Sequence, residues 1–165
     1  MSRLSLILLS ILLILTPIAY AEAVSISQVG ISFTVPDDFT RGSSDYGIVE
    51  WKGPMKGSRS WSIRLQVTPL MKGFNVKDMY EQDFKTHQQS TNSYSSVTSL
   101  TAPGAVGGFL AQKRIDKVSS LSHYWQAILY GRSFQYDFMF FGDSSTFNEY
   151  RPVIYNILRS IRITK

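Results

Sequence analysis

The sequence predicts an α+β fold: an antiparallel β-sheet meander with an inserted helix and a C-terminal helix packed on it, preceded by a signal peptide. Three observations support this prediction. Short runs of β-branched and aromatic residues are separated by Gly, Pro and Ser, which is typical of strands joined by turns. Two other segments repeat apolar residues at helical spacing. The first 21 residues have the pattern of an export signal.

The N-terminal segment has the three parts of a secretory signal peptide. Arg3 supplies a basic start, an apolar run extends from Leu4 to Leu15, and Ala19-Tyr20-Ala21 offers small residues to signal peptidase. The apolar run is shorter than the ~20 residues that a transmembrane helix requires. We therefore expect cleavage near Ala21 and a product that is periplasmic or secreted.

The composition excludes several classes of protein. The chain has no cysteine, so thiol catalysis, thiolate metal sites and a covalent lipid anchor on cysteine are ruled out. Its net charge of +5 is moderate, and no Lys/Arg run suggests nucleic-acid binding. Such a charge favours at most a weak contact with anionic surfaces. Without internal repeats or shifts in composition, residues 22–165 are expected to form a single domain.

Strands account for the first part of that domain. Val24–Val29 and Ile31–Val35 are rich in β-branched residues and meet at Gly30, which predicts a hairpin. A third strand is expected within Tyr46–Lys52, because a Gly-Pro pair closes that apolar run. The clearest strand covers residues 61–68, where apolar and polar residues alternate and define a buried face and a solvent face.

The pattern becomes helical after Asn75. Apolar residues recur at helical spacing from Val76 to His87, and Asn75 suits the N-cap position. The polar stretch 90–96 is expected to be a surface loop. Further strands of the meander are predicted at residues 96–101, 108–118, 121–130 and 133–141.

A second helix is expected near the C-terminus. Tyr150, Ile154 and Ile157 belong to one apolar stripe, which suits a helix packed on the sheet. Pro152 fits a helix best in its first turn, where the missing N–H costs nothing. We therefore predict that this helix begins near Tyr150 or Arg151.

Short motifs stand at both ends of the domain. Phe33–Phe39 (FTVPDDF) joins a strand to a proline, acidic residues and an aromatic residue, and Ile157–Ile161 reads ILRSI. In these segments the chain resembles the PsbP-like superfamily, which includes the DcrB-like bacterial envelope proteins. The resemblance implies an antiparallel sheet with packed helices and a binding, chaperone-like or assembly role. It carries over no catalytic residue, and the chain lacks the cysteine on which the lipoprotein members are acylated.

The two histidines are the starting point for any acid–base chemistry. His87 ends the predicted first helix, where a cation is favourable, so its role is interpreted as structural. His123 is expected to pair with Asp116, Asp137 or Asp143 across strands if the chain is a hydrolase. No serine lies in a Gly-x-Ser-x-Gly motif, and no metal-ligand spacing is present. We therefore predict no enzymatic activity, no metal and no cofactor, with a hydrolase built on His123 as an alternative.

One stretch interleaves basic and aromatic residues. Trp and Arg are the side chains that most often anchor protein interfaces. The stretch is therefore a candidate partner-binding site, with a solvated charged edge as the alternative interpretation. Its residues are Trp51, Lys52, Lys56, Arg59, Trp61 and Arg64.

Together these features predict an exported, non-enzymatic protein-binding domain. Its partner is expected to be another envelope or secreted protein, and its role that of an envelope assembly factor or a periplasmic immunity or chaperone-like protein. A small-ligand or lipid-binding periplasmic protein that uses the aromatic-rich sheet is the alternative.

Overall fold

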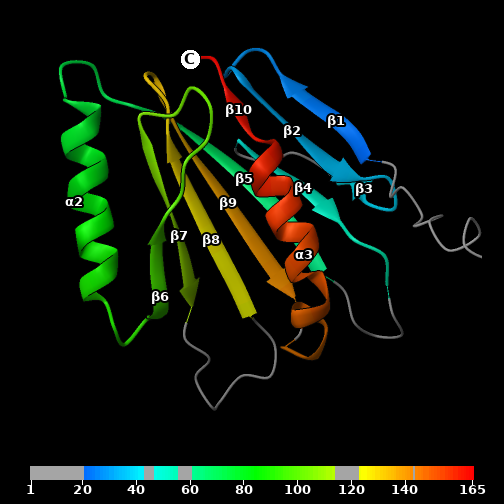
Figure 1. Ribbon diagram of the computed structural model, residues 1–165. Coiled ribbons are helices and arrows are strands. Elements are labelled where there is room, and N and C mark those ends of the chain that lie inside the picture. The colour runs from blue at the N-terminus through cyan, green and yellow to red at the C-terminus, as the bar shows by residue number, and fades with distance from the viewer. Residues whose placement is uncertain (1–20, 43–46, 56–60, 114–122, 143) are drawn as a thin grey trace, which may run out of the picture.

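The computed structural model describes residues 21–42, 47–55, 61–113, 123–142 and 144–165 (Figure 1). These residues form two antiparallel sheets and two helices, which confirms the predicted α+β class. The signal peptide predicted for residues 1–21 lies almost entirely outside the described residues. Within them, no helix is long and apolar enough to cross a membrane.

The smaller sheet contains three strands in the order β1-β2-β10. β1 (Ala21–Ile26) and β2 (Ile31–Pro36) form the predicted hairpin, and β10 (Arg162–Ile163) pairs with the start of β2. Gly30 occupies the turn at a φ of 67°, a conformation that residues with a Cβ rarely adopt. β10 was not predicted, because two residues are too few to show a periodic pattern.

The larger sheet contains seven strands in the order β3-β4-β5-β9-β8-β7-β6, and every neighbouring pair is antiparallel. The four consecutive strands β6 to β9 form the predicted meander, and β9 continues the sheet by pairing with β5 along its full length. The strands are β3 (Thr40–Arg41), β4 (Ile48–Lys52), β5 (Trp61–Pro69), β6 (Tyr94–Ser99), β7 (Gly107–Lys113), β8 (His123–Tyr130) and β9 (Phe134–Gly142).

The main core lies between the two sheets. Alternate residues of β9, including Tyr136, Phe138 and Phe140, are fully buried on one face of the larger sheet. Phe33 from β2 meets Phe138 edge to face, with ring centroids 5.1 Å apart. Such aromatic contacts add to the free energy gained from burying the rings. The smaller sheet therefore covers part of this face.

α3 (Ser144–Ser160) covers more of the same face. Ile154, Ile157 and Ile161, which follows the helix, are almost completely buried against the sheet. The helix begins well before the predicted start near Tyr150 or Arg151, so that prediction was wrong and Pro152 lies inside the helix. An internal proline removes one helical hydrogen bond at a cost of about 3 kcal/mol. Burial of the apolar stripe on the sheet is large enough to offset it.

α2 (Val76–Gln89) packs against the opposite face, over β6 and β7 (Figure 1). As predicted, Asn75 is its N-cap, and the Asn75 side chain accepts a hydrogen bond from the Lys77 N–H at 3.0 Å. Tyr80 and Phe84 of α2 pack on a second apolar cluster that includes Phe109 of β7. The loop predicted for residues 90–96 is shorter than expected, because β6 already begins at Tyr94.

Candidate functional site

The predicted basic and aromatic residues do not share a surface. Trp51 and Trp61 are each only 2% exposed and belong to the main core, whereas Lys52 and Arg64 are exposed. Successive residues of a strand point to opposite faces of a sheet, so a tryptophan and the lysine that follows it diverge. The prediction that the two tryptophans anchor a partner at the surface was therefore wrong. Lys56 and Arg59 lie outside the described residues.

Arg64 is largely engaged within the chain. Its Nε lies 2.9 Å from Oε1 of Glu50, across the β4–β5 pair. Its guanidinium also lies over the Phe141 ring, 4.8 Å from the centroid. These contacts partly satisfy the positive charge of Arg64, which is therefore a less distinctive binding group than the sequence suggested.

The β8–β9 register does not bring His123 opposite Asp137, as the predicted pair requires. His123 lies opposite Gly142 in the β8–β9 register, whereas Asp137 lies opposite Ile128. Five residues along a strand correspond to roughly 16 Å, which is beyond the reach of a side-chain hydrogen bond. The other proposed partners, Asp116 and Asp143, lie outside the described residues.

A polar contact connects α2 to the sheet. The Tyr130 hydroxyl donates to Oδ2 of Asp83 at 2.5 Å. Nδ1 of His87 lies 3.2 Å from Oδ1 of Asp83, and the His87 ring packs on Phe109. Burial, followed by the contact with Asp83, raises the pKa of Tyr130. The histidine has a structural role here, as predicted for a residue near the helix end.

Asp137 lies beside this contact on β9. Its Oδ2 accepts a hydrogen bond of 2.7 Å from Nε2 of Gln126, whereas its Oδ1 is buried without a partner among the described residues. Burial raises the pKa of Asp137 to about 6, although Gln126 and His87 oppose that shift. A buried carboxylate with one free oxygen costs stability when it is ionised.

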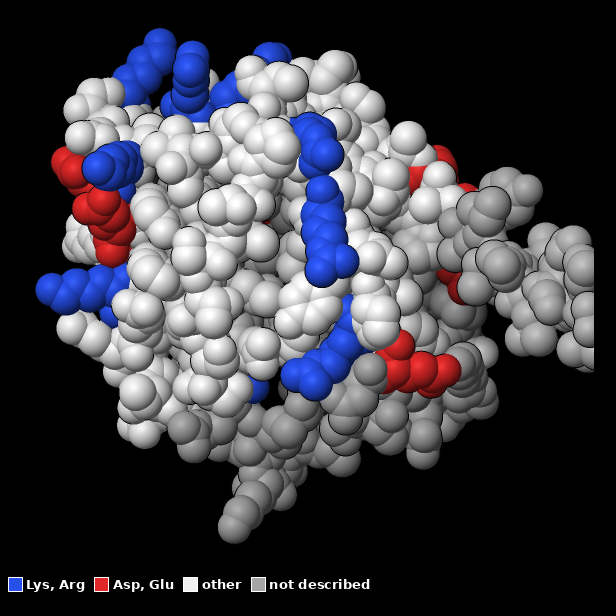
Figure 2. All heavy atoms as spheres, in the orientation of Figure 1, with Lys and Arg blue, Asp and Glu red and all other residues white. Residues whose placement is uncertain are grey.

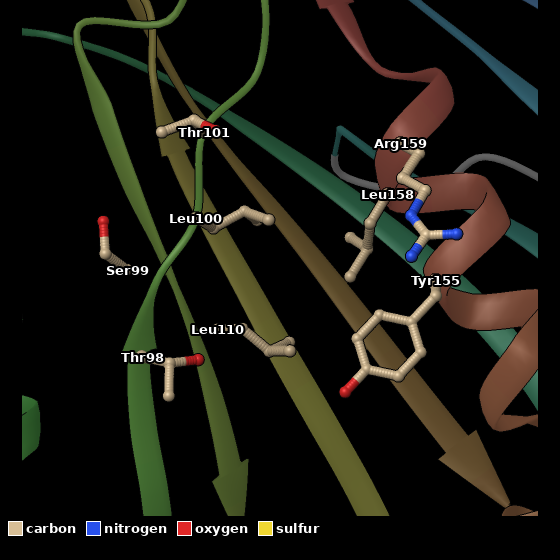
Figure 3. A pocket seen from close by; sticks show the side chains of 8 residues that line it. All are labelled: Thr98, Ser99, Leu100, Thr101, Leu110, Tyr155, Leu158 and Arg159. Atoms are coloured by element: carbon tan, nitrogen blue, oxygen red, sulfur yellow. The ribbon is translucent and has the colours of Figure 1, made fainter.

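A groove lies on the face that carries α3, between this helix and the end of β6 (Figure 3). We call it the α3–β6 groove. Its volume is about 310 Å³, enough for one or two large side chains. The residues that line it are Thr98, Ser99, Leu100, Thr101, Leu110, Tyr155, Leu158 and Arg159.

The centre of the groove is apolar and its borders are polar. Leu110 of β7 and Leu158 of α3 are almost completely buried and point toward one another (Figure 3). Tyr155 is 40% exposed, and its ring packs edge to face on Trp125 at 5.4 Å. Thr98 and Thr101 lie on the opposite wall, and Thr98 brings its hydroxyl to the groove (Figure 3). This arrangement suits a ligand with an apolar group and polar flanks.

Basic side chains border the groove along α3. Arg151, Tyr155 and Arg159 are spaced four residues apart and lie on one exposed stripe of the helix. Figure 2 shows Lys and Arg side chains in a column along this part of the molecule, beside a broad uncharged surface. Arg159 forms no ion pair with any residue in the described part of the chain. Its charge is available to an acidic group.

The neighbouring edge of the sheet has free backbone groups. The Leu100 N–H donates to the Gly108 carbonyl at 2.9 Å, so the backbone polar groups of Leu100 point toward β7. Because backbone groups alternate sides along a strand, those of Val97 and Ser99 point away from β7. They have no hydrogen-bond partner within the described ranges. β6 also lacks the charges and prolines that commonly protect edge strands.

The architecture defines a class: an α+β domain in which a meander of strands is covered by a helix on each face. Comparison with solved structures shows that this fold is similar to that of PsbP, which confirms the fold that the sequence resemblance implied. The solution structure of cyanobacterial PsbP (CyanoP) from Synechocystis sp. PCC 6803 superposes with a TM-score of 0.62 at 11% identity, covering 90% of this chain and 95% of that chain.

A second solved structure gives the same result. The crystal structure of LpqN, which is involved in cell envelope biogenesis of Mycobacterium tuberculosis, has a TM-score of 0.61 at 12% identity and covers 88% of this chain and 91% of that one. No protein-family model and no curated protein sequence matches the chain. At these identities the likeness concerns the fold alone.

Proposed function

We propose that this chain is an exported, non-enzymatic domain that binds an extended segment of another protein in the α3–β6 groove. The observation that carries the proposal is the position of this apolar groove. It lies between the Arg159 guanidinium and the outer edge of β6, neither of which has a partner among the described residues. The three features together match the requirements of an extended peptide, which presents apolar side chains, charged side chains and a free backbone.

The apolar centre of the groove supplies affinity. A large side chain that covers Leu110 and Leu158 also covers the exposed ring of Tyr155. Exposed tyrosines at the border of such a site are frequent anchors of protein interfaces, because they offer a large and rigid contact area. The Trp125 ring packs against the Tyr155 ring and restricts its motion, so the Tyr155 side chain loses little conformational entropy on binding.

Arg159 favours ligands that carry a negative charge. A guanidinium at the mouth of an apolar groove favours a ligand carboxylate through a charge-assisted hydrogen bond. The net positive charge of the chain also favours encounter with an acidic segment. We therefore expect the bound segment to carry Asp or Glu beside a large apolar residue.

Export is the second part of the proposal. The signal peptide predicted for residues 1–21 would direct the chain out of the cytoplasm. Its partner would then be an envelope or secreted protein. One protein with the same fold, LpqN, is described as involved in cell envelope biogenesis. The absence of cysteine suits a free periplasmic or secreted product.

Photocrosslinking identifies the partner. A photoreactive phenylalanine analogue at Tyr155 is expected to capture a specific protein in cells that export the chain. The same analogue at Lys77, an exposed residue on α2, is the matched control. Equal labelling from both positions, or none from Tyr155, would contradict the proposed site. A small molecule retained in native mass spectra, with no crosslinked protein, would instead favour the ligand-binding alternative.

Two substitutions in the groove are expected to weaken the captured partner's binding by about tenfold or more each. Tyr155→Ala removes the exposed ring, and Arg159→Glu reverses the charge at the groove mouth. Binding of the purified partner is measured by biolayer interferometry. Tyr155→Phe and Lys77→Glu are the controls and should bind as the unaltered chain does. Retained affinity in both groove variants would refute the assignment.

A further inference from the structure

One end of the molecule concentrates exposed apolar side chains. Met71 is 66% exposed, Phe74 is 58% exposed and Val106 is 42% exposed. They are three of the five large hydrophobic residues that are most exposed in the described part of the chain. Single exposed apolar residues are common, but a group of them at one end marks an interaction surface.

Backbone hydrogen bonds hold the segments of this end together. The Leu70 N–H donates to the Ser133 carbonyl at 2.9 Å, which ties the loop before α2 to the β8–β9 turn. The Val106 N–H donates to the Tyr130 carbonyl at 2.7 Å. These bonds place Val106 beside the β8–β9 turn. The apolar residues are therefore presented on adjoining loops of a common end (Figure 1).

The loop between β5 and α2 forms a protruding turn. Gly73 has a φ of 90°, a conformation that favours glycine. A Cβ at this position would meet no atom within 4 Å, so the turn extends into open solvent. Met71 and Phe74 lie on either side of this glycine within two residues of it, and both side chains are exposed. Neither side chain belongs to a core cluster.

Basic residues surround the apolar ones. Lys72, Arg132 and Lys165 are exposed at this end, and the Arg132 N–H donates to the Lys165 carbonyl at 3.1 Å. Figure 2 shows Lys and Arg side chains gathered along the same edge of the molecule. Asp78 in the first turn of α2 is the nearby acidic residue along the chain, and Lys77 pairs with Glu81. The balance at this end is positive.

We propose that this end docks on an anionic lipid bilayer. We call it the apolar–basic tip, formed by Met71, Lys72, Phe74, Val106, Arg132 and Lys165. Exposed Met and Phe side chains enter the interface between headgroups and acyl chains, while each nearby cation gains from the negative surface potential. The two contributions add, because interfacial binding grows with the apolar area that is buried and with the attraction to anionic lipids. This inference is independent of the proposed groove.

Vesicle cosedimentation with the exported chain tests the tip. We expect binding to phosphatidylcholine vesicles that contain phosphatidylglycerol, and little binding to pure phosphatidylcholine. Met71→Ser combined with Phe74→Ser should weaken binding by at least about tenfold, because two apolar side chains lose their burial. Tyr155→Ser, which removes an exposed aromatic residue elsewhere, is the matched control and should bind normally.

Charge reversal provides the second arm of the test. Lys72→Glu combined with Arg132→Glu should weaken binding to the anionic vesicles by about tenfold or more and reduce its salt dependence. Lys77→Glu, which alters a lysine already paired with Glu81 on α2, should weaken vesicle binding less. All these residues are exposed, so the melting temperatures should match that of the unaltered chain. Equal binding to both vesicle types, or unchanged binding of both double variants, would overturn the proposal.

Discussion

Replacing Trp61 by alanine is expected to lower the free energy of unfolding by about 3–5 kcal/mol. The Trp61 indole is 2% exposed and stacks on Tyr150 of α3 with ring centroids 4.2 Å apart. It also meets Phe39 edge to face at 4.4 Å. Removing the ring leaves a cavity where α3 packs on the larger sheet. Urea denaturation with the unaltered chain as reference measures the loss.

Trp61→Phe is the matched control. The indole Nε1 is buried without a hydrogen-bond partner among the described residues, so phenylalanine removes an unsatisfied donor and retains most of the aromatic contact. We expect this variant to lose less than about 2 kcal/mol. Unchanged stability of Trp61→Ala, together with lost partner binding, would contradict the buried position and restore Trp61 as a surface anchor.

Replacing Asp137 by asparagine is expected to stabilise the protein by up to about 3 kcal/mol above pH 7 and by little near pH 4. Burial raises the pKa of the folded carboxyl from 3.8 to about 6. The neutral Asp137 carboxyl is compatible with burial, so its contribution to the free energy of unfolding is fully present below the unfolded pKa of 3.8. This contribution is lost as the pH rises through about 6, where the buried carboxyl ionises. Asparagine stays neutral and can accept the same hydrogen bond from Gln126.

Urea denaturation across that pH range measures the effect of Asp137→Asn. Asp83 also raises the pKa of Asp137, whereas Gln126 and His87 lower it. Because His87 itself acts on the pKa of Asp137, the comparison is repeated in a His87→Gln background, where the pH-dependent gain should persist. A gain that is equal at low and high pH would show that Asp137 does not titrate in this way.

Local elements of the fold were predictable where a short pattern determines them. Gly30 between two β-branched runs indicated the first hairpin, and Asn75 before a helical repeat indicated the start of α2. The alternation in residues 61–68 gave the buried face of β5. In each case the signal lies within about ten residues of sequence, so no knowledge of the tertiary structure was needed.

Other features depend on contacts that are distant in the sequence. β10 exists because Arg162 and Ile163 meet β2, and α3 continues through Pro152 because its apolar stripe is buried on the sheet. The α3–β6 groove requires the strand order, which places β6 at an edge. Its residues carry no motif. The error on Trp51 had a different origin, since strand alternation already separates that residue from Lys52.

Titration of the isotope-labelled chain with the bound segment of the crosslinked partner, followed by amide NMR, tests the central claim most directly. If an extended segment binds in the α3–β6 groove, amide shifts should change at residues 98–101 and 155–159. The outward N–H of Ser99 should also gain protection from hydrogen exchange, because it then pairs with the segment. Shift changes centred on α2 or on the β4–β5 face, with residues 98–101 and 155–159 unaffected, would contradict the account.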